Sequence, residues 1–246
     1  MVLIAFFGVF AASFMDAIAG GGGIISIPVY MWAGLPVHLA LATNKVSASL
    51  GLLGSVGRFI RSGYIRWRLA IPSVALSLAG STLGMRLQLM VPEKYLEYLL
   101  LAVLPVVAAV VLRRRALPES PGGISRRRQM VLVLAASALV GVYDGFYGPG
   151  TGTFLILLYT GLGRLDVRTA SGHAKLVNLA SGVGSLLTAM RYGQVFWSLG
   201  LIAAAAAFAG QFAGAGLAIR GGARIVRPVV LLALLLLAAK VLSGLL

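Results

Sequence analysis

The stretch DAIAGGGGIISIP, from Asp16 to Pro28, places an acid and four consecutive glycines inside a long apolar segment. Glycine is unfavourable in a helix interior, and a carboxylate is costly in hydrocarbon. A second stretch, GVYDGFYGPGT at 141–151, repeats the pattern around Asp144. The sequence therefore predicts that one long apolar segment in each half of the chain is interrupted at a defined point.

The composition indicates an integral membrane protein. Of the 246 residues, 59% are hydrophobic and 11% are charged, whereas soluble domains average about 25% charged residues. The net charge is +15, but the basic residues gather between apolar segments, as the positive-inside rule places them, so we expect no nucleic-acid partner. With no cysteine and only two histidines, we expect neither disulfides nor a metal cluster.

The apolar residues form eight segments, at 2–34, 39–60, 68–90, 95–113, 129–163, 168–190, 197–219 and 226–245. Most are close to the roughly 20 residues that a membrane-spanning helix needs, but the first and fifth are too long for one crossing. RRRALPESPGGISRRR, at 113–128, is the clearest polar stretch and is typical of a linker. We therefore expect a first repeat at 1–113, a basic cytoplasmic linker at 114–128 and a second repeat at 129–246.

The two halves resemble each other. Besides the two acids, the aligned pairs include Lys45 with Lys175, Gly54 with Gly184, Arg61 with Arg191 and Trp67 with Trp197. The Lys and Arg content of the turns places 61–68, the linker, 164–168 and 220–227 in the cytoplasm, so corresponding turns lie on opposite sides. This predicts an all-α integral membrane protein of two inverted-topology repeats, each a glycine-broken helical hairpin plus three transmembrane helices, with both termini outside.

Each glycine break is expected to form a hairpin tip near the bilayer midplane. The arm after the first break, Ile24–Gly34, covers about 15 Å, or half a hydrocarbon core. The arm before it, Val2–Ala19, would reach about 27 Å, which leaves open whether that arm tilts, begins outside the membrane or crosses it. Free N–H groups at the start of the second arm favour an anion. Alternatively, glycines let helices pack closely, which is the role we expect for Gly80 and Gly84.

The helix that follows each hairpin carries polar residues at depth. Lys45, in TNKVSAS, and Lys175, in GHAKLVN, enter from opposite sides by roughly 10 Å. An ammonium there needs a partner or water, so we expect a cationic, donor-rich site for a small oxyanion; snorkelling to the interface is the alternative. The predicted substrate-binding residues are Gly20, Gly21, Gly22, Gly23, Thr43, Asn44, Lys45, Gly148, Gly150, Thr151, His173, Lys175 and Asn178.

Asp16 and Asp144 are candidates for carrying a coupling proton or for pairing with a lysine. Their alternative role is local, because aspartate also satisfies freed backbone N–H groups at turns. His173 is either a titrating group or a packed, hydrogen-bonded histidine. No catalytic residue, metal ligand or cofactor is expected.

Four motifs, DAIAGGGGIISIP, LATNKVSASLG, DGFYGPGTGTF and SGHAKLVNLASG, resemble those of the sulfite exporter TauE/SafE family of membrane permeases. The resemblance covers nearly the whole chain. It implies export of sulfite or small organosulfonates across the cytoplasmic (plasma) membrane, coupled to an ion gradient. Pro149 interrupts the second glycine run, and Ala174 stands where Asn44 would align, so the two half-sites are not equivalent.

These observations predict a secondary transporter that works by alternating access around a midplane anion site. The expected partners are a small anionic substrate, membrane lipid, a coupling proton and a second copy in a homodimer. A passive anion channel, or a permease for sulfate or carboxylates, is the nearest alternative. The sequence has neither a GxSxG nor an HExxH motif, which argues against a membrane enzyme.

Overall fold

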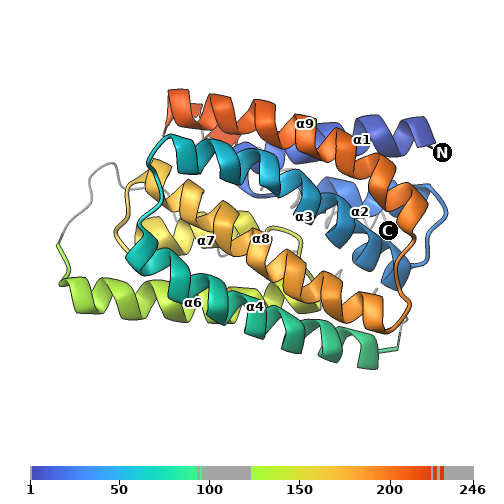
Figure 1. Ribbon diagram of the computed structural model, residues 1–246, viewed down its shortest axis with the longest axis horizontal. Coiled ribbons are helices and arrows are strands. Elements are labelled where there is room, and N and C mark those ends of the chain that lie inside the picture. Colours follow the sequence, from blue (N-terminus) through green and yellow to red (C-terminus); the bar gives the residue numbers. More distant parts are fainter. Residues whose placement is uncertain (1, 93–94, 96–122, 223, 226–227, 230–246) are drawn as a thin grey trace.

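The computed structural model describes residues 2–92, 95, 123–222, 224–225 and 228–229 (Figure 1). All regular elements within these residues are α-helices, which confirms the predicted all-α class. They are α1 (Val2–Ala19), α2 (Gly23–Trp32), α3 (Val37–Arg61), α4 (Trp67–Met90), α6 (Arg126–Phe146), α7 (Thr151–Gly161), α8 (Val167–Arg191) and α9 (Trp197–Gly221). Most of the predicted segments 95–113 and 226–245, the linker residues 114–122 and both ends of the chain lie outside the described residues.

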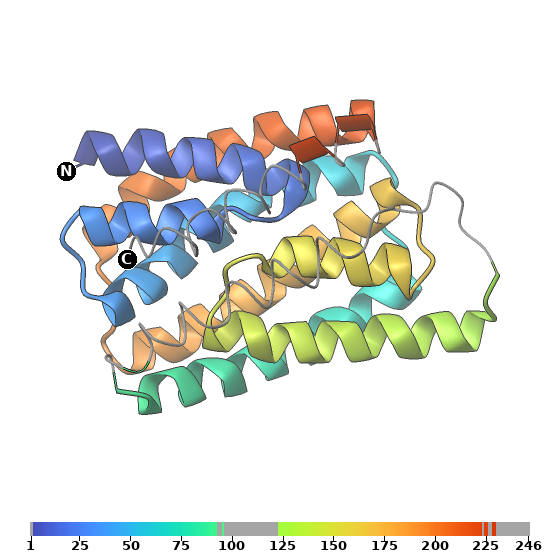
Figure 2. The ribbon, with the colours of Figure 1, turned by 180° about the vertical axis from the view of Figure 1, so that it is seen from behind.

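Both glycine-rich stretches interrupt a helix and reverse the chain. After α1, Gly20 adopts a positive φ of 82°, and α2 runs back along α1. After α6, Gly148 and Gly150 adopt φ values of 94° and 81°, and α7 returns along α6. Such backbone angles favour glycine because a side chain would be strained there. Figure 2 shows the two hairpins entering the molecule from opposite ends, as an inverted repeat requires; the equivalence of the complete halves stays a prediction.

The two halves are interleaved. The longer arm of the first hairpin, α1, packs against α9, and the longer arm of the second, α6, packs against α4. In turn, α3 packs against α8 and α9, and α8 also packs against α4. Each hairpin therefore rests on a helix that belongs to the other half.

Small residues permit these close crossings. A Cβ atom added to Gly80 would lie 2.8 Å from the carbonyl oxygen of Ala138, and one added to Gly84 would overlap the backbone of Val142. Both contacts join α4 to α6. The predicted role of these glycines in close helix packing is confirmed.

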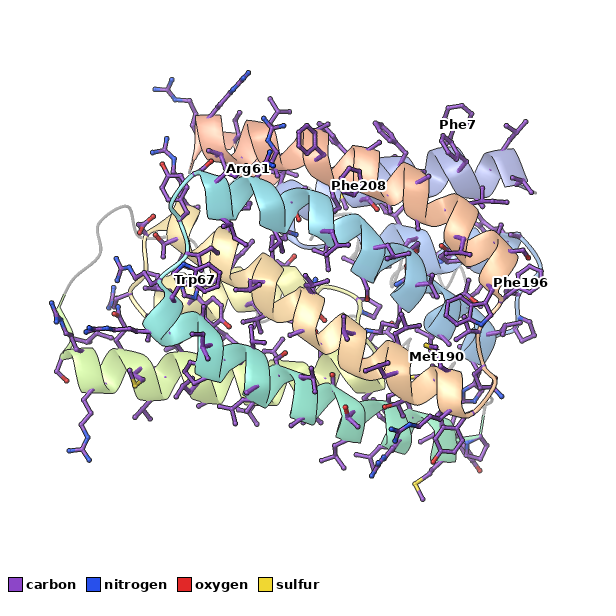
Figure 3. All side chains as sticks on the ribbon, viewed as in Figure 1. Phe7, Arg61, Trp67, Met190, Phe196 and Phe208 are labelled. Atoms are coloured by element: carbon purple, nitrogen blue, oxygen red, sulfur yellow. The ribbon has the colours of Figure 1, made fainter. Side chains whose placement is uncertain are left out.

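The outer surface of the bundle is apolar. Figure 3 shows Phe7 and Phe208 on one outer face, and their exposed fractions are 64% and 47%. Three of the described helices, α1, α6 and α9, are long and apolar enough to cross a membrane. A surface of this kind suits hydrocarbon as its solvent, in agreement with an integral membrane protein.

The two ends of the bundle differ in charge. The end of α3 with Arg61, the turn before Trp67, the start of α6, the α7–α8 turn and the end of α9 all lie at one end (Figures 1 and 3). Most of the described arginines belong to these segments. Met190 and Phe196 lie at the opposite end. The turns that the sequence assigns to the cytoplasm therefore share one end of the described structure.

Candidate functional site

The two helix breaks meet in the interior of the protein. The carbonyl oxygen of Gly20 accepts a hydrogen bond of 3.2 Å from the amide of Thr153. The Thr153 hydroxyl donates to the carbonyl oxygen of Ala19 at 2.7 Å. A Cβ atom on Gly20 would overlap the backbone of Gly152. The predicted meeting of the two breaks is confirmed, and it requires glycine on both sides of the contact.

Two buried ion pairs cross between the halves. The Nζ atom of Lys45 lies 3.0 Å from Oδ2 of Asp144 and donates to the Asp144 carbonyl oxygen at 2.6 Å. The Nζ atom of Lys175 lies 2.8 Å from Oδ2 of Asp16 and also donates to the Asp16 carbonyl oxygen. Each lysine on the helix after one hairpin thus binds the acid before the break of the other hairpin. Pairing with a lysine, one of the roles considered for the two acids, is confirmed.

The acids also hold the local geometry of the breaks. Oδ1 of Asp16 accepts a 3.0 Å hydrogen bond from the amide of Gly22. Oδ1 of Asp144 accepts one of 2.8 Å from the hydroxyl of Thr151, the first residue of α7. The alternative role of Asp16, accepting a hydrogen bond from a freed backbone N–H group at the turn, is therefore confirmed. Asp144 holds its own break through the side chain of Thr151 instead of a backbone amide. The proton-carrying role of both acids stays a prediction.

A cavity lies where these elements converge. Its empty space is about 560 Å³, a figure that includes the part open to solvent. The predicted residues that line it are Asp16, Gly20, Gly22, Gly23, Asn44, Lys45, Asp144, Gly148, Thr151 and Asn178. The structure thus gathers most of the predicted residues around one space, although their role in binding a substrate stays a prediction.

The remaining predicted residues do not line this cavity; they are Gly21, Thr43, Gly150, His173 and Lys175. Thr43 Oγ1 accepts from the amide of Phe196 at 3.1 Å, and His173 Nε2 accepts from the amide of Arg66 at 2.9 Å. Lys175 is completely buried against Asp16. Thr43 and His173 thus bind groups away from the cavity, whereas Lys175 binds Asp16, which itself lines it. For His173 the packed, hydrogen-bonded alternative is confirmed.

Some polar residues of the cavity were not predicted; they are Ser13, Ser26, Ser47 and Gln211. Ser26 donates to Oδ1 of Asn44 at 2.7 Å, which fixes the orientation of the Asn44 amide. Gln211 donates to Oδ2 of Asp16 at 2.6 Å. Gln211 is the one amide side chain in the apolar segment 197–219, and this isolation was the signal that could have identified it.

The electrostatics of the site differ from the expectation of a cationic centre. Two lysines and two aspartates balance one another in the paired state. The remaining positive character comes from α2, which begins at Gly23 in the cavity wall. The amides of Ile24, Ile25 and Ser26 donate to the carbonyl oxygens of Gly21 and Gly22. The dipole of α2 and the amide of Gly23 therefore remain to favour an anion at this end. Lys45, at 6% exposure, is the lysine that reaches the cavity.

Comparison with known proteins places the chain among membrane transporters. Residues 4–241 match the family model described as sulfite exporter TauE/SafE. The probable membrane transporter protein ORF9 of Sinorhizobium sp is 33% identical, over 97% of this chain and 91% of that protein. The probable membrane transporter protein YfcA of Escherichia coli K12 is also 33% identical, over 97% and 88%. A probable membrane transporter protein of Haemophilus influenzae is 32% identical, over 94% and 90%. No solved structure matches the chain.

Proposed function

The chain belongs to the sulfite exporter TauE/SafE family of membrane transporters, and on this premise we propose that it carries small sulfur oxyanions, sulfite or C2–C3 organosulfonates, out of the cell. The single observation that supports an anion as the substrate is the cavity between the two helix breaks, which combines a buried lysine with the N-terminus of a half-helix. A small tetrahedral or pyramidal oxyanion matches these donors in charge.

Within this proposal the anion binds Lys45 directly. The Nζ atom of Lys45 supplies the charge, Gly23 supplies a backbone amide, and the Asn44 side chain supplies further donors once Ser26 has fixed its orientation. Hydrogen bonds to an ionised acceptor are shorter and roughly twice as strong as neutral ones, which suits a sulfonate or sulfite oxygen. Thr151 and Asn178 complete the wall on the side of the second half.

The same proposal assigns an orientation and a mechanism. The arginine-rich end of the bundle faces the cytoplasm of a plasma-membrane protein, according to the positive-inside rule. The cavity lies between elements of both halves, as expected for a carrier in which one repeat moves against the other around a fixed site. A carboxyl group at each break, Asp16 or Asp144, offers a place for a coupling proton.

The experiment is a flux assay on protein purified and reconstituted in proteoliposomes. Wild-type protein should release internal sulfite and isethionate (2-hydroxyethanesulfonate), and Lys45→Gln should reduce this release to that of empty liposomes. Arg61→Gln, which removes an exposed cation at the end of α3, is the matched control and should retain normal flux. Normal flux in Lys45→Gln would refute the assignment of the anion site.

A pH gradient separates a coupled carrier from a channel. A carrier should accumulate isethionate above its equilibrium concentration when the gradient is imposed, whereas a passive pore only equilibrates the anion. If isethionate only equilibrates across the membrane, the protein is a channel and not a coupled carrier, and the proposed anion site is unaffected.

A further inference from the structure

The two crossed ion pairs are chemically unequal. At Asp16, Oδ1 accepts from the Gly22 amide, and Oδ2 accepts from both Lys175 and Gln211. Every oxygen of this carboxylate is therefore bound, and Lys175 is completely buried. Separating the partners of a fully hydrogen-bonded buried ion pair is energetically costly, because it leaves two buried charges unpaired.

The carboxylate of Asp144 is less completely bound. Its Oδ1 accepts from Thr151, but its buried Oδ2 makes no hydrogen bond among the described residues, although Lys45 Nζ lies 3.0 Å away. The ammonium of Lys45 also donates to the Asp144 carbonyl oxygen at 2.6 Å. Among the described residues, Oδ2 of Asp144 thus has the single contact with Lys45, whereas Oδ2 of Asp16 accepts from two donors, so the carboxylate of Asp144 loses fewer contacts if it gives up its ion pair.

The sequence explains this difference between the pairs. Gly210 aligns with Gly80, so the residue that corresponds to Gln211 is Ser81. The Ser81 hydroxyl donates to the carbonyl oxygen of Leu78 at 3.0 Å, within its own helix. Asp144 thus lacks the second side-chain donor that Gln211 provides to Asp16.

The surroundings of Asp144 contain one cation in contact with it. Lys45 comes from α3, and α7 contributes the neutral Thr151. On α6 itself the neighbouring titratable side chains are Tyr143 and Tyr147, and α4 faces this part of α6 with Ser77 and Ser81. On α8, the ammonium of Lys175 is bound to Asp16. Within the described residues, then, Asp144 and any anion in the cavity share the same partner, Lys45.

We propose that Asp144 and the substrate anion compete for Lys45, so that the anion binds as Asp144 takes up one proton, while Asp16 stays ionised and paired with Lys175. This inference rests on the proposed function and specifies its coupling. The charges balance in both states: an ammonium with a carboxylate before binding, and an ammonium with a bound monovalent anion and a neutral carboxylic acid after it. One proton then crosses in the same direction as each monovalent anion, and the transport cycle moves no net charge, so export is driven by the outward concentration gradient of the anion.

The test uses purified full-length protein and isethionate, whose sulfonate stays ionised wherever carboxyl groups titrate. Above the pH at which the carboxyl titrates, the isethionate Kd of the wild type should rise about tenfold per pH unit, as uptake of one proton requires. The Kd of Asp144→Asn should not depend on pH. Infrared difference spectra should show one carboxyl group becoming protonated when isethionate is added to the wild type.

The carboxyl signal in the infrared difference spectrum can be assigned to one residue, because the chain has only six acidic residues. The carboxyl signal should disappear in Asp144→Asn and persist in Asp166→Asn, which removes an acid at the start of α8. Should Asp144→Asn not fold, Asp144→Glu keeps the acid and should shift the frequency of the signal. A signal unchanged by both Asp144 substitutions, or binding of isethionate to the wild type with no carboxyl signal, would overturn the inference. Failure of the wild type to bind either isethionate or sulfite would instead overturn the proposed function on which it rests.

Discussion

Lys175 and Asp16 lie 159 positions apart in the chain, and the Nζ atom of one meets Oδ2 of the other at 2.8 Å in the interior of the bundle. This pair joins the helix after the second hairpin to the first hairpin. Gln211 of α9 binds the same carboxylate oxygen, so three helices converge on one acid.

The pair should be essential for stability. Lys175→Met leaves a buried carboxylate without its cation and should lower the free energy of unfolding by about 3–5 kcal/mol. Combining Lys175→Met with Asp16→Asn removes both charges and should restore part of that loss. Denaturant unfolding of the purified protein measures both effects, with Arg191→Met, at the exposed end of the same helix, as the control. A double variant no more stable than the single one would contradict this account.

The contact between the two helix breaks predicts a strict requirement at Gly20. Gly20→Ala places a Cβ atom into the backbone of Gly152 and adds strain at a φ of 82°, so little folded protein should be recovered. Gly57→Ala is the matched control, because its Cβ would meet nothing within 4 Å, and a helix-interior alanine gains up to about 1 kcal/mol. Yield of monodisperse protein by size-exclusion chromatography reports the difference. Equal yields for the two variants would show that the breaks do not touch.

The position of His173 predicts a structural role outside the anion site. His173→Leu removes the acceptor for the Arg66 amide and should cost about 1–3 kcal/mol of stability, with no change in the Kd for isethionate. Arg66→Ala keeps the backbone donor and should be less destabilising. Thermal unfolding and isethionate titration separate stability from binding. If His173→Leu has normal stability but binds isethionate more weakly, His173 belongs to the substrate site and this account is wrong.

The orientation of the bundle is testable because the chain contains no cysteine. Ser62→Cys places a thiol at the arginine-rich end, and Tyr192→Cys places one at the opposite end, both at exposed positions. A membrane-impermeant maleimide should label Tyr192→Cys in intact cells, and Ser62→Cys only after the membrane is permeabilised. The reverse pattern would invert the proposed topology.

The local features of the fold could be predicted from the sequence because each depends on a short stretch. The breaks after Ala19 and Phe146 follow from runs of glycine in apolar segments, and their meeting follows from placing both breaks at similar depth. The depths of Lys45 and Lys175 follow from counting residues along a helix. These inferences need only helix geometry and the thickness of the membrane.

The crossed pairing could not be predicted to the same degree. Whether Lys45 binds the acid of its own hairpin or that of the other depends on how the two halves pack together, and no local pattern encodes this packing. The same limit explains why Lys175 was expected in the cavity, since its burial depends on its ion pair with Asp16 of α1. His173 was assigned to the site because of its neighbours in sequence, yet its partner is a turn 107 positions away.

The interleaving of the halves has a consequence for biosynthesis. The helix α1 is synthesised well before α9, against which it packs. Until both α8 and α9 have been made, Asp16 has neither Lys175 nor Gln211 as a partner. A polypeptide truncated before residue 175 therefore lacks both side chains that bind Oδ2 of Asp16, and its first hairpin cannot reach the arrangement of the complete fold.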